Sequence, residues 1–106
     1  MIARIWNGAT RDEDADDYEQ YMRETAVPGY TAIPGHRTLL MLRRRRGDGN
    51  TEFTMVTCWD DMGAVGAFAG QDPERAVFQP RDEQFLVERD LIVRHYDVYG
   101  ATGLAG

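Results

Sequence analysis

Two kinds of hydrophobic spacing alternate along the chain. Apolar and polar residues alternate in residues 2–9, 37–46, 51–59 and 91–99, which predicts four strands. Between the first two strands, apolar residues recur at steps of three or four. This spacing predicts a helix that opens at the acidic residues 12–14 and ends at Pro28-Gly29. A second helix is expected from Asp60 or Asp61 to about Ala69.

Shorter sequence patterns predict turns in the segments between these helices and strands. The turn at residues 47–50 should join two strands as a hairpin. Asp72-Pro73 predicts a helical turn that Pro80 stops, and residues 82–87 predict another turn. The resulting order, β-α-β-β-α-β, predicts an α+β domain of the ferredoxin-like split βαβ type, with a four-stranded antiparallel sheet. We expect this domain to span residues 1–100, followed by a flexible tail at 101–106.

The two predicted helices can cover only one face of the sheet. The alternation leaves apolar residues for the other face as well: Ile2, Trp6, Leu39, Met41 and Val56, with Tyr96 and Val98 as further candidates. An exposed apolar surface of that extent usually marks an interface. The pattern therefore predicts a homodimer in which two sheets pack face to face.

Composition and charge indicate which binding partners the protein should lack. The 106 residues carry a formal net charge of −6, the opposite of what a nucleic-acid-binding protein needs. One cysteine and two histidines argue against a structural zinc site, and we expect no metal. No apolar run approaches the length of a membrane span and no signal peptide is recognisable, so we expect a cytoplasmic protein without a membrane partner. The basic run Arg43 to Arg46 should be solvated or should pair with acidic residues of a second protomer.

Several strings, in this order and spacing, identify a family resemblance. They are Ile2-Ala3-Arg4-Ile5-Trp6, Pro34-Gly35 leading into Leu39 to Arg44, Glu52-Phe53 running to Cys58-Trp59-Asp60, Phe68-Ala69-Gly70 with Ala76-Val77-Phe78, and His95 to Val98. With them, nearly the whole chain resembles the antibiotic biosynthesis monooxygenase-like domains of the dimeric α/β-barrel superfamily. The resemblance implies a homodimer with a cavity between sheet and helices in each protomer. Some members oxidise polycyclic phenols to quinones without metal or flavin, and others bind and degrade haem.

Asn7 and Trp59 are candidate catalytic residues near the ends of two strands that should be adjacent. If both side chains point towards the helices, an amide and an indole N–H converge on one cavity. Such donors could stabilise a phenolate or enolate and the reduced oxygen species that it forms. Asparagine and tryptophan at matching positions also recur in the oxygenase members that the chain resembles. The alternative is that Trp59 is core bulk and Asn7 caps a strand end.

His95 is a third candidate, as a general base or an orienting group. It shares a face of the last strand with Val93 and could remove a phenolic proton near neutral pH. A structural, hydrogen-bonded histidine is the alternative reading. His36 follows a loop and is expected to be peripheral.

Six further side chains are candidates for binding a substrate. The first helix should present three of them to a cavity and the later segments three more: Tyr18, Tyr21, Met22, Phe68, Phe78 and Phe85. The stretch from Gly70 to Asp90 could be a mobile cover or an ordinary surface connection. The helix residues could equally be ordinary core.

Together these features predict an oxidoreductase. We expect a cofactor-independent monooxygenase-like enzyme, with no bound cofactor, that oxidises a planar aromatic or polyketide-type molecule. The alternative is a non-catalytic, stress-related or ligand-binding dimer. Haem degradation is a weaker third option, because residues 67–71 contain no histidine where the family's haem enzymes carry one.

Overall fold

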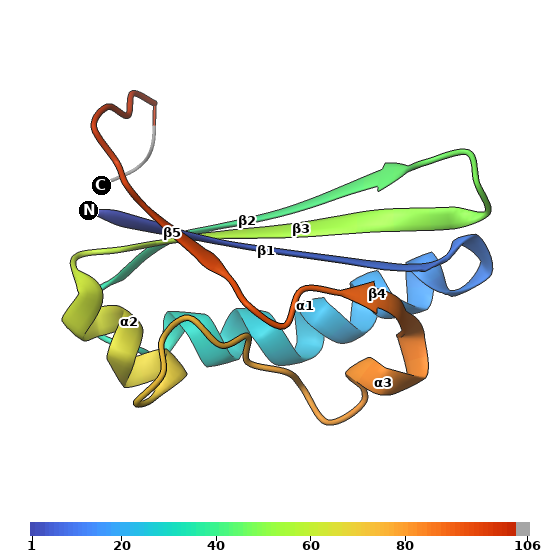
Figure 1. Ribbon diagram of the computed structural model, residues 1–106, viewed down its shortest axis with the longest axis horizontal. Coiled ribbons are helices and arrows are strands. Elements are labelled where there is room, and N and C mark those ends of the chain that lie inside the picture. Colours follow the sequence, from blue (N-terminus) through green and yellow to red (C-terminus); the bar gives the residue numbers. More distant parts are fainter. Residues whose placement is uncertain (104–106) are drawn as a thin grey trace.

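A single antiparallel sheet forms one layer of the molecule, and helices cover one of its faces (Figure 1). The computed structural model describes residues 1–103, so residues 104–106 of the predicted tail lie outside the described residues. The strands are β1 (Ile2–Arg11), β2 (His36–Arg45), β3 (Asn50–Trp59), β4 (Leu86–Arg89) and β5 (Arg94–Asp97). Their order is β2-β3-β1, and both β4 and β5 pair with the far side of β1. The predicted α+β, ferredoxin-like arrangement is confirmed, with its last strand divided in two.

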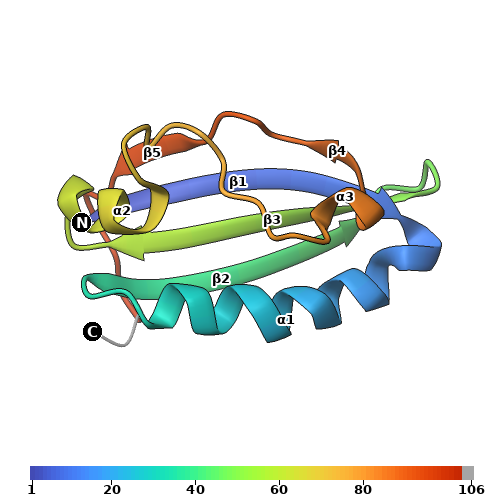
Figure 2. The same cartoon turned by 90° about the horizontal axis from the view of Figure 1, so that it is seen from below.

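Helix α1 (Ala15–Thr31) follows a short 3-10 turn (Asp12–Asp14) and lies along the sheet (Figure 2). The predicted end at Pro28-Gly29 is wrong, because Pro28 lies inside the helix. Both Pro28 and Gly29 are exposed, so the hydrogen bond that proline cannot donate is lost on the side facing water. The extra turn brings Tyr30 against Phe68, with ring centroids 4.6 Å apart. Tertiary packing thus overrides the local stop signal.

Helix α2 (Met62–Ala69) begins and ends where local chemistry dictates. The Asp61 side chain caps it by accepting a hydrogen bond from the Ala64 N–H at 2.9 Å. Gly70 closes it with φ of 83°, a conformation that favours glycine. Val65 is fully buried and fixes the helix to the core. The predicted second helix is therefore confirmed.

The long final strand is replaced by a different pairing, and the predicted helical turn at Asp72-Pro73 is a single turn, in which the Arg75 N–H donates to Asp72 O at 3.1 Å. Near Asp72 only a turn forms, and the helical element of this region is the short α3 (Asp82–Phe85). Residues 91–93 leave β1 and pair with residues 74–76 instead, through Ala76 N–H to Leu91 O at 2.9 Å and Val93 N–H to Glu74 O at 2.7 Å. The connection after α2 is thereby held to the sheet edge.

The register assigns the two faces of the sheet. Strand β3 has the predicted orientation, with Phe53, Met55, Thr57 and Trp59 towards the helices. On β1 and β2 the predicted orientation is wrong. Trp6 and Met41 both lie opposite Met55, Leu39 lies opposite Thr57, and Ile2 lies opposite Trp59. Alternation defines two sets of residues on a strand, but both sets here are apolar enough to face a core.

The outer face of the sheet remains apolar after this correction. Its residues include Ile5, Leu40, Leu42, Val56 and Tyr96. Leu40, Leu42 and Tyr96 are 44%, 50% and 47% exposed. Val56 and Tyr96 are the members of the predicted interface that lie here. The outer face therefore does expose apolar side chains, but most of them differ from the residues predicted to lie there.

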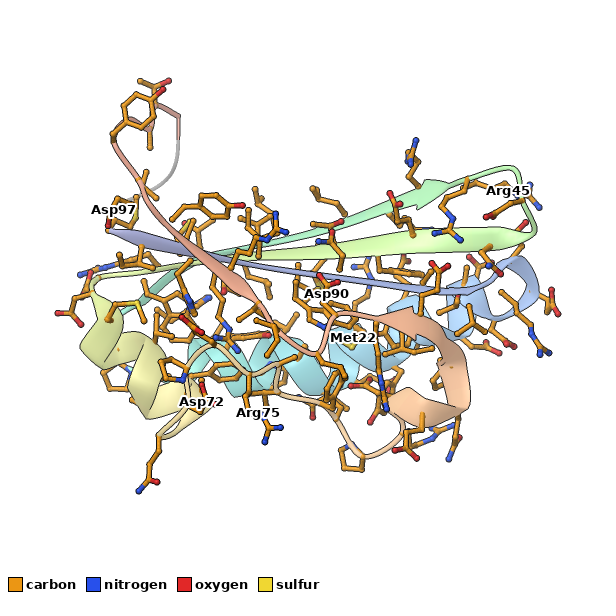
Figure 3. All side chains as sticks on the ribbon, viewed as in Figure 1. Met22, Arg45, Asp72, Arg75, Asp90 and Asp97 are labelled. Atoms are coloured by element: carbon orange, nitrogen blue, oxygen red, sulfur yellow. The ribbon has the colours of Figure 1, made fainter. Side chains whose placement is uncertain are left out.

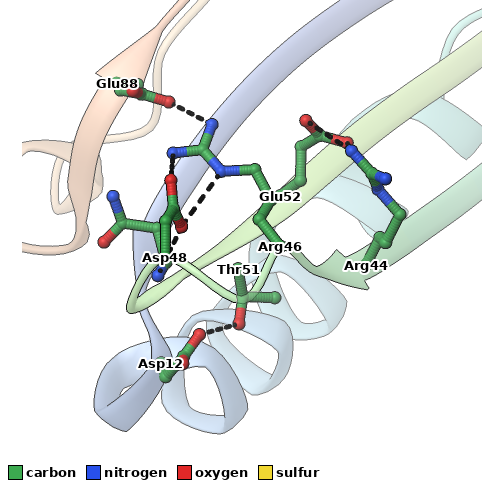
Figure 4. A network of polar contacts seen from close by, with 8 residues as sticks. Asp12, Arg44, Arg46, Asp48, Thr51, Glu52 and Glu88 are labelled. Carbon is green, nitrogen blue, oxygen red and sulfur yellow. Dashed lines mark hydrogen bonds and ion pairs between the residues drawn. The ribbon is translucent and has the colours of Figure 1, made fainter.

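The basic run at the end of β2 forms ion pairs with acidic residues of its own chain. Arg46 contacts Asp48 at 2.9 Å and Glu88 at 2.6 Å, and Arg44 contacts Glu52 at 3.2 Å (Figure 4). One partner of each pair is exposed, so the pairs add little to stability. They satisfy the charge of the hairpin locally and leave no basic patch for an anionic ligand there.

Candidate functional site

A cavity lies between the sheet, α1 and the connection that follows α2. Arg4, Trp6 and Met55 line it from the sheet, and side chains of α1 and of residues 68–82 close it. Figure 3 shows Met22 in this layer of side chains. The space open to the centre of a water molecule is about 20 Å³, and roughly 10–15 Å³ by that measure holds one water. The cavity as it stands therefore admits water but no aromatic molecule.

Arg4 is a buried cation at one wall of this cavity. Only 4% of its surface is exposed, and its partners are the carbonyls of Pro73 and Arg75 and the Nε2 atom of His95. No carboxylate within residues 1–103 pairs with it. Burial lowers the pKa of its guanidinium. A buried charge with only neutral partners is costly for folding, which makes it a candidate functional group.

His95 lies on the helix side of the sheet, directly opposite Arg4 in the register. Its Nε2 atom is 3.0 Å from Arg4 Nη1. Because arginine can only donate, Nε2 must accept, which places the imidazole proton on Nδ1. Burial, followed by the nearby Arg4 cation, lowers the pKa of His95. The predicted base is thus a neutral group whose accepting nitrogen is already occupied.

Trp59 faces the helices, as predicted, and is fully buried. Its indole N–H donates to Thr57 Oγ1 at 2.9 Å. The ring packs against Phe68, with centroids 5.5 Å apart, and against His36 at 5.1 Å. The predicted donor is therefore engaged inside the protein, and the contacts favour the alternative reading that Trp59 is core.

Asn7 lies on the outer face, so the predicted convergence with Trp59 is wrong. It is paired with Thr54, whose Oγ1 donates to Asn7 Oδ1 at 2.7 Å. Asn7 Nδ2 donates to Asp90 Oδ2 at 3.2 Å, and the Asn7 backbone N–H donates to the same oxygen at 3.1 Å. Asn7 thus ties the break between β4 and β5 to the sheet. The error follows from the reversed orientation of β1.

His36 is part of an aromatic cluster rather than peripheral. It stacks on Tyr30 at 5.9 Å and meets Trp59 edge-on. Its Nε2 atom is buried without a hydrogen-bond partner in the described part of the chain, and burial lowers its pKa. Tyr30 was missed as a site residue because it follows Pro28, where the sequence pattern predicts that α1 has ended.

Of the six predicted binding residues, three line the cavity: Tyr18, Met22 and Phe68. The other three stand behind it. Tyr21 accepts a hydrogen bond from the Arg81 N–H at 2.9 Å and stacks on Phe85. Phe78 meets the edge of Trp6 at 6.4 Å. Half of the predicted binding residues thus contact the cavity, and the other half pack against other aromatic residues.

Asp82 is a buried acid in the cavity wall that sequence reasoning missed. Only 3% of it is exposed. Its Oδ2 atom accepts a hydrogen bond from the Gln79 N–H at 2.6 Å. Desolvation by burial raises its pKa. It stands in a charge-rich stretch where nothing in the sequence distinguishes it from its exposed neighbours.

Comparison with known proteins identifies the fold. No protein-family profile matches the sequence, and no curated protein is significantly similar. Among solved structures, a protein of Nitrosomonas europaea provisionally named an antibiotic biosynthesis monooxygenase gives a TM-score of 0.69 at 15% identity, covering 96% of this chain and 93% of that one. One of Deinococcus radiodurans with the same provisional name gives 0.64 at 19% identity, with both chains fully covered. An MhuD mutant with two manganese protoporphyrin IX molecules per active site gives 0.63 at 17% identity, covering 97% of this chain and 99% of that one.

At these identities the likeness establishes the antibiotic biosynthesis monooxygenase fold and leaves the reaction open. Within residues 1–103, no cluster of three histidine, cysteine, aspartate or glutamate side chains could hold a metal ion. No helix in that part of the chain is long and apolar enough to cross a membrane.

Proposed function

We propose that this protein is a monooxygenase-like enzyme that oxidises a planar aromatic or polyketide-type molecule in the cavity between sheet and helices, without a bound cofactor. The shared fold supports an oxygenase-like class. The observation that carries the proposal is the buried Arg4 guanidinium, which faces a cavity walled by Trp6, Tyr18, Tyr30 and Phe68. The flat apolar side chains suit the rings of an aromatic molecule. The desolvated cation suits a substrate that gains negative charge during the reaction.

The chemistry explains why such a cation is useful. Oxidation of a phenol or enol by O₂ begins when the hydroxyl proton leaves and negative charge develops on the substrate. A fixed cation in a water-poor site stabilises this charge and the superoxide formed by electron transfer. A guanidinium has five N–H donors, of which Arg4 uses three in its recorded contacts. In this proposal the remaining donors bind a substrate oxygen.

The cover of the cavity is tied to the same residue. Residues 70–81 contain no helix or strand and cross the helix side of the sheet (Figure 2). Arg4 holds this connection through the carbonyls of Pro73 and Arg75. A substrate that displaces the cover would free these N–H groups at the moment when its own oxygen can accept them. Substrate entry and charge stabilisation would then be coupled through Arg4.

Oxygen consumption tests the proposal. Wild-type protein should consume O₂ with a panel of tricyclic phenols and hydroquinones and yield a product with added oxygen by mass spectrometry. Arg4→Gln should lower turnover by roughly 10²–10³, the usual cost of removing one donor to an oxyanion. Arg4→Lys should retain more activity than Arg4→Gln. Arg37→Gln removes an exposed arginine paired with Asp60 and serves as the matched control.

Two results would contradict this assignment. One is a wild-type protein that consumes no O₂ with any member of the panel. The other is an Arg4→Gln variant that is folded by circular dichroism and as active as the control.

A non-catalytic ligand-binding module is the second candidate. The observation in its favour is that the indole N–H of Trp59 and the accepting nitrogen of His95 are both engaged inside the protein. A binding module would show thermal stabilisation by aromatic ligands without oxygen consumption or product.

Haem does not fit the residues of the cavity. Tyr30 and Phe68 are in ring contact at 4.6 Å, where a porphyrin would need an open slot. Helix α2 contains no histidine, and His95 Nε2 is held by Arg4. We therefore expect no Soret shift when haem is titrated into the protein.

The outer face supports a homodimer as part of the proposal. Leu40, Leu42 and Tyr96 form an exposed apolar surface. Two of the charges beside it, Arg44 and Glu52, already pair with each other, whereas the exposed Arg94 lies on the same face opposite Ile5 and has to stay solvated at the margin of the interface. A two-fold arrangement of two sheets is the simplest way to cover it.

A further inference from the structure

Two polar atoms at one end of the cavity lack hydrogen-bond partners. They are the Tyr18 hydroxyl and the Asp82 Oδ1 atom, both buried and without a partner in the described residues. The two residues are 1% and 3% exposed, and both line the cavity. Buried polar groups are almost always hydrogen-bonded in native proteins. An unpaired acceptor and an unpaired hydroxyl that belong to the lining of one cavity call for a shared partner, which is a water molecule in the closed cavity and a ligand hydroxyl once a ligand enters.

The surrounding charges do not neutralise this acid. Arg81 lies over the ring of Tyr21 at 5.3 Å, and Arg89 lies over Phe78 at 4.9 Å. Neither forms an ion pair with Asp82, although Arg89 acts on it at longer range. Gln79 fixes one carboxylate oxygen. The other oxygen has no partner in the described residues, and Asp82 belongs to the lining of the cavity.

We propose that Asp82 and Tyr18 form a hydroxyl-binding subsite, in which Asp82 Oδ1 accepts the hydrogen bond and then the proton of a phenol or enol hydroxyl, while the Tyr18 hydroxyl donates to the same ligand oxygen. The O–H bond of the ligand breaks, its electron pair stays on the ligand oxygen, and the proton forms a new bond to Oδ1. This inference rests on the proposed function, since it requires an aromatic ligand in the cavity.

The position of the subsite also indicates how many oxygen atoms the ligand should carry. Asp82 belongs to α3, whereas Arg4 lies against Phe68 of α2, and these helices occupy opposite ends of the helix layer (Figure 1). A ligand that reaches both groups carries a hydroxyl that loses its proton to Asp82 and a second oxygen, conjugated with the first, onto which the negative charge spreads beside Arg4. The substrate class is thus a hydroxylated aromatic or enol with a second oxygen function, rather than a plain hydrocarbon.

Binding of naphthol and of its methyl ether to the intact protein tests the inference without needing turnover. The two probes share the aromatic body, but the ether cannot donate a hydrogen bond. Wild-type protein should bind naphthol about tenfold or more tightly in calorimetry, as expected for one hydrogen bond to a charged acceptor. Asp82→Asn should reduce this preference strongly, and Tyr18→Phe should reduce it in part. Tyr99→Phe is the control, because it makes the same change at a fully exposed tyrosine outside the cavity lining.

The outcomes separate the two proposals. Equal binding of both probes by the wild type would overturn the subsite while leaving the aromatic cavity intact. Absence of binding by either probe would overturn the subsite together with the proposed function. Because the probes are compared on the wild type first, a variant that fails to fold does not prevent a decision.

Discussion

Replacing Asn7 by alanine should lower stability and leave the cavity chemistry intact. The change removes two side-chain hydrogen bonds, one from Thr54 Oγ1 at 2.7 Å and one to Asp90 Oδ2 at 3.2 Å. A hydrogen bond contributes roughly 0.5–1.5 kcal/mol net, and exposed ones lie at the lower end. We therefore expect the free energy of unfolding to fall by about 1–2 kcal/mol. The backbone N–H of Asn7 still bonds to Asp90, which limits the loss.

Calorimetry can measure this loss. With an unfolding entropy of roughly 2.1 cal/mol/K per residue, a loss of this size in a domain of about a hundred residues lowers the Tm by roughly 4–9 °C. Thr54→Val removes only the bond to Asn7 Oδ1 and should cost about half as much. Oxygen consumption and ligand binding should remain at the wild-type level in both variants. Loss of turnover at unchanged stability would refute the structural role and restore Asn7 as a catalytic residue.

Two further predictions concern the outer face and the buried acid. Leu42→Asp places a charge on the exposed apolar face and should convert the proposed dimer to a folded monomer in light scattering, whereas a dimer that persists would move the interface elsewhere. Burial raises the pKa of Asp82, so the folded state holds this proton more tightly than the unfolded state. The free energy of unfolding should then fall as pH rises from the ordinary aspartate value through the raised one. Asp82→Asn should lack this fall, and its stability relative to wild type should increase over that pH range in urea titrations. A stability difference that stays constant with pH would contradict a pKa raised by burial. Arg89, Tyr18 and Tyr30 are the other charged or titratable groups that interact with this carboxyl.

The secondary structure of the chain was largely predictable because its signals are local. The N-cap of α2 at Asp61 and the hairpin between β2 and β3 depend on residues within a few positions of each other. The end of α1 was not predictable, because the packing of Tyr30 on Phe68 outweighs the stop signal of Pro28. The division of the last strand was also not predictable, because it too depends on tertiary contacts. Its break depends on pairing with residues 74–76, which are distant in sequence.

The candidate site was less predictable than the fold. Tyr18, Met22 and Phe68 were found because helical spacing and bulk mark residues that face a core. Arg4 and Asp82 were missed, because a charged residue in a sequence is expected at the surface unless its tertiary partners are known.

The sequence by itself determined the order of elements and the existence of a second apolar sheet face, since these follow from spacing along one chain. Only the tertiary structure decided which face of β1 points inward. A strand of alternating residues has two faces, and a one-residue shift exchanges them. On β1 the choice depends on pairing with β3, which places Trp6 beside Met55 and Asn7 beside Thr54. That pairing removes Asn7 from the cavity and brings Arg4 into it, and the proposed chemistry follows from that exchange.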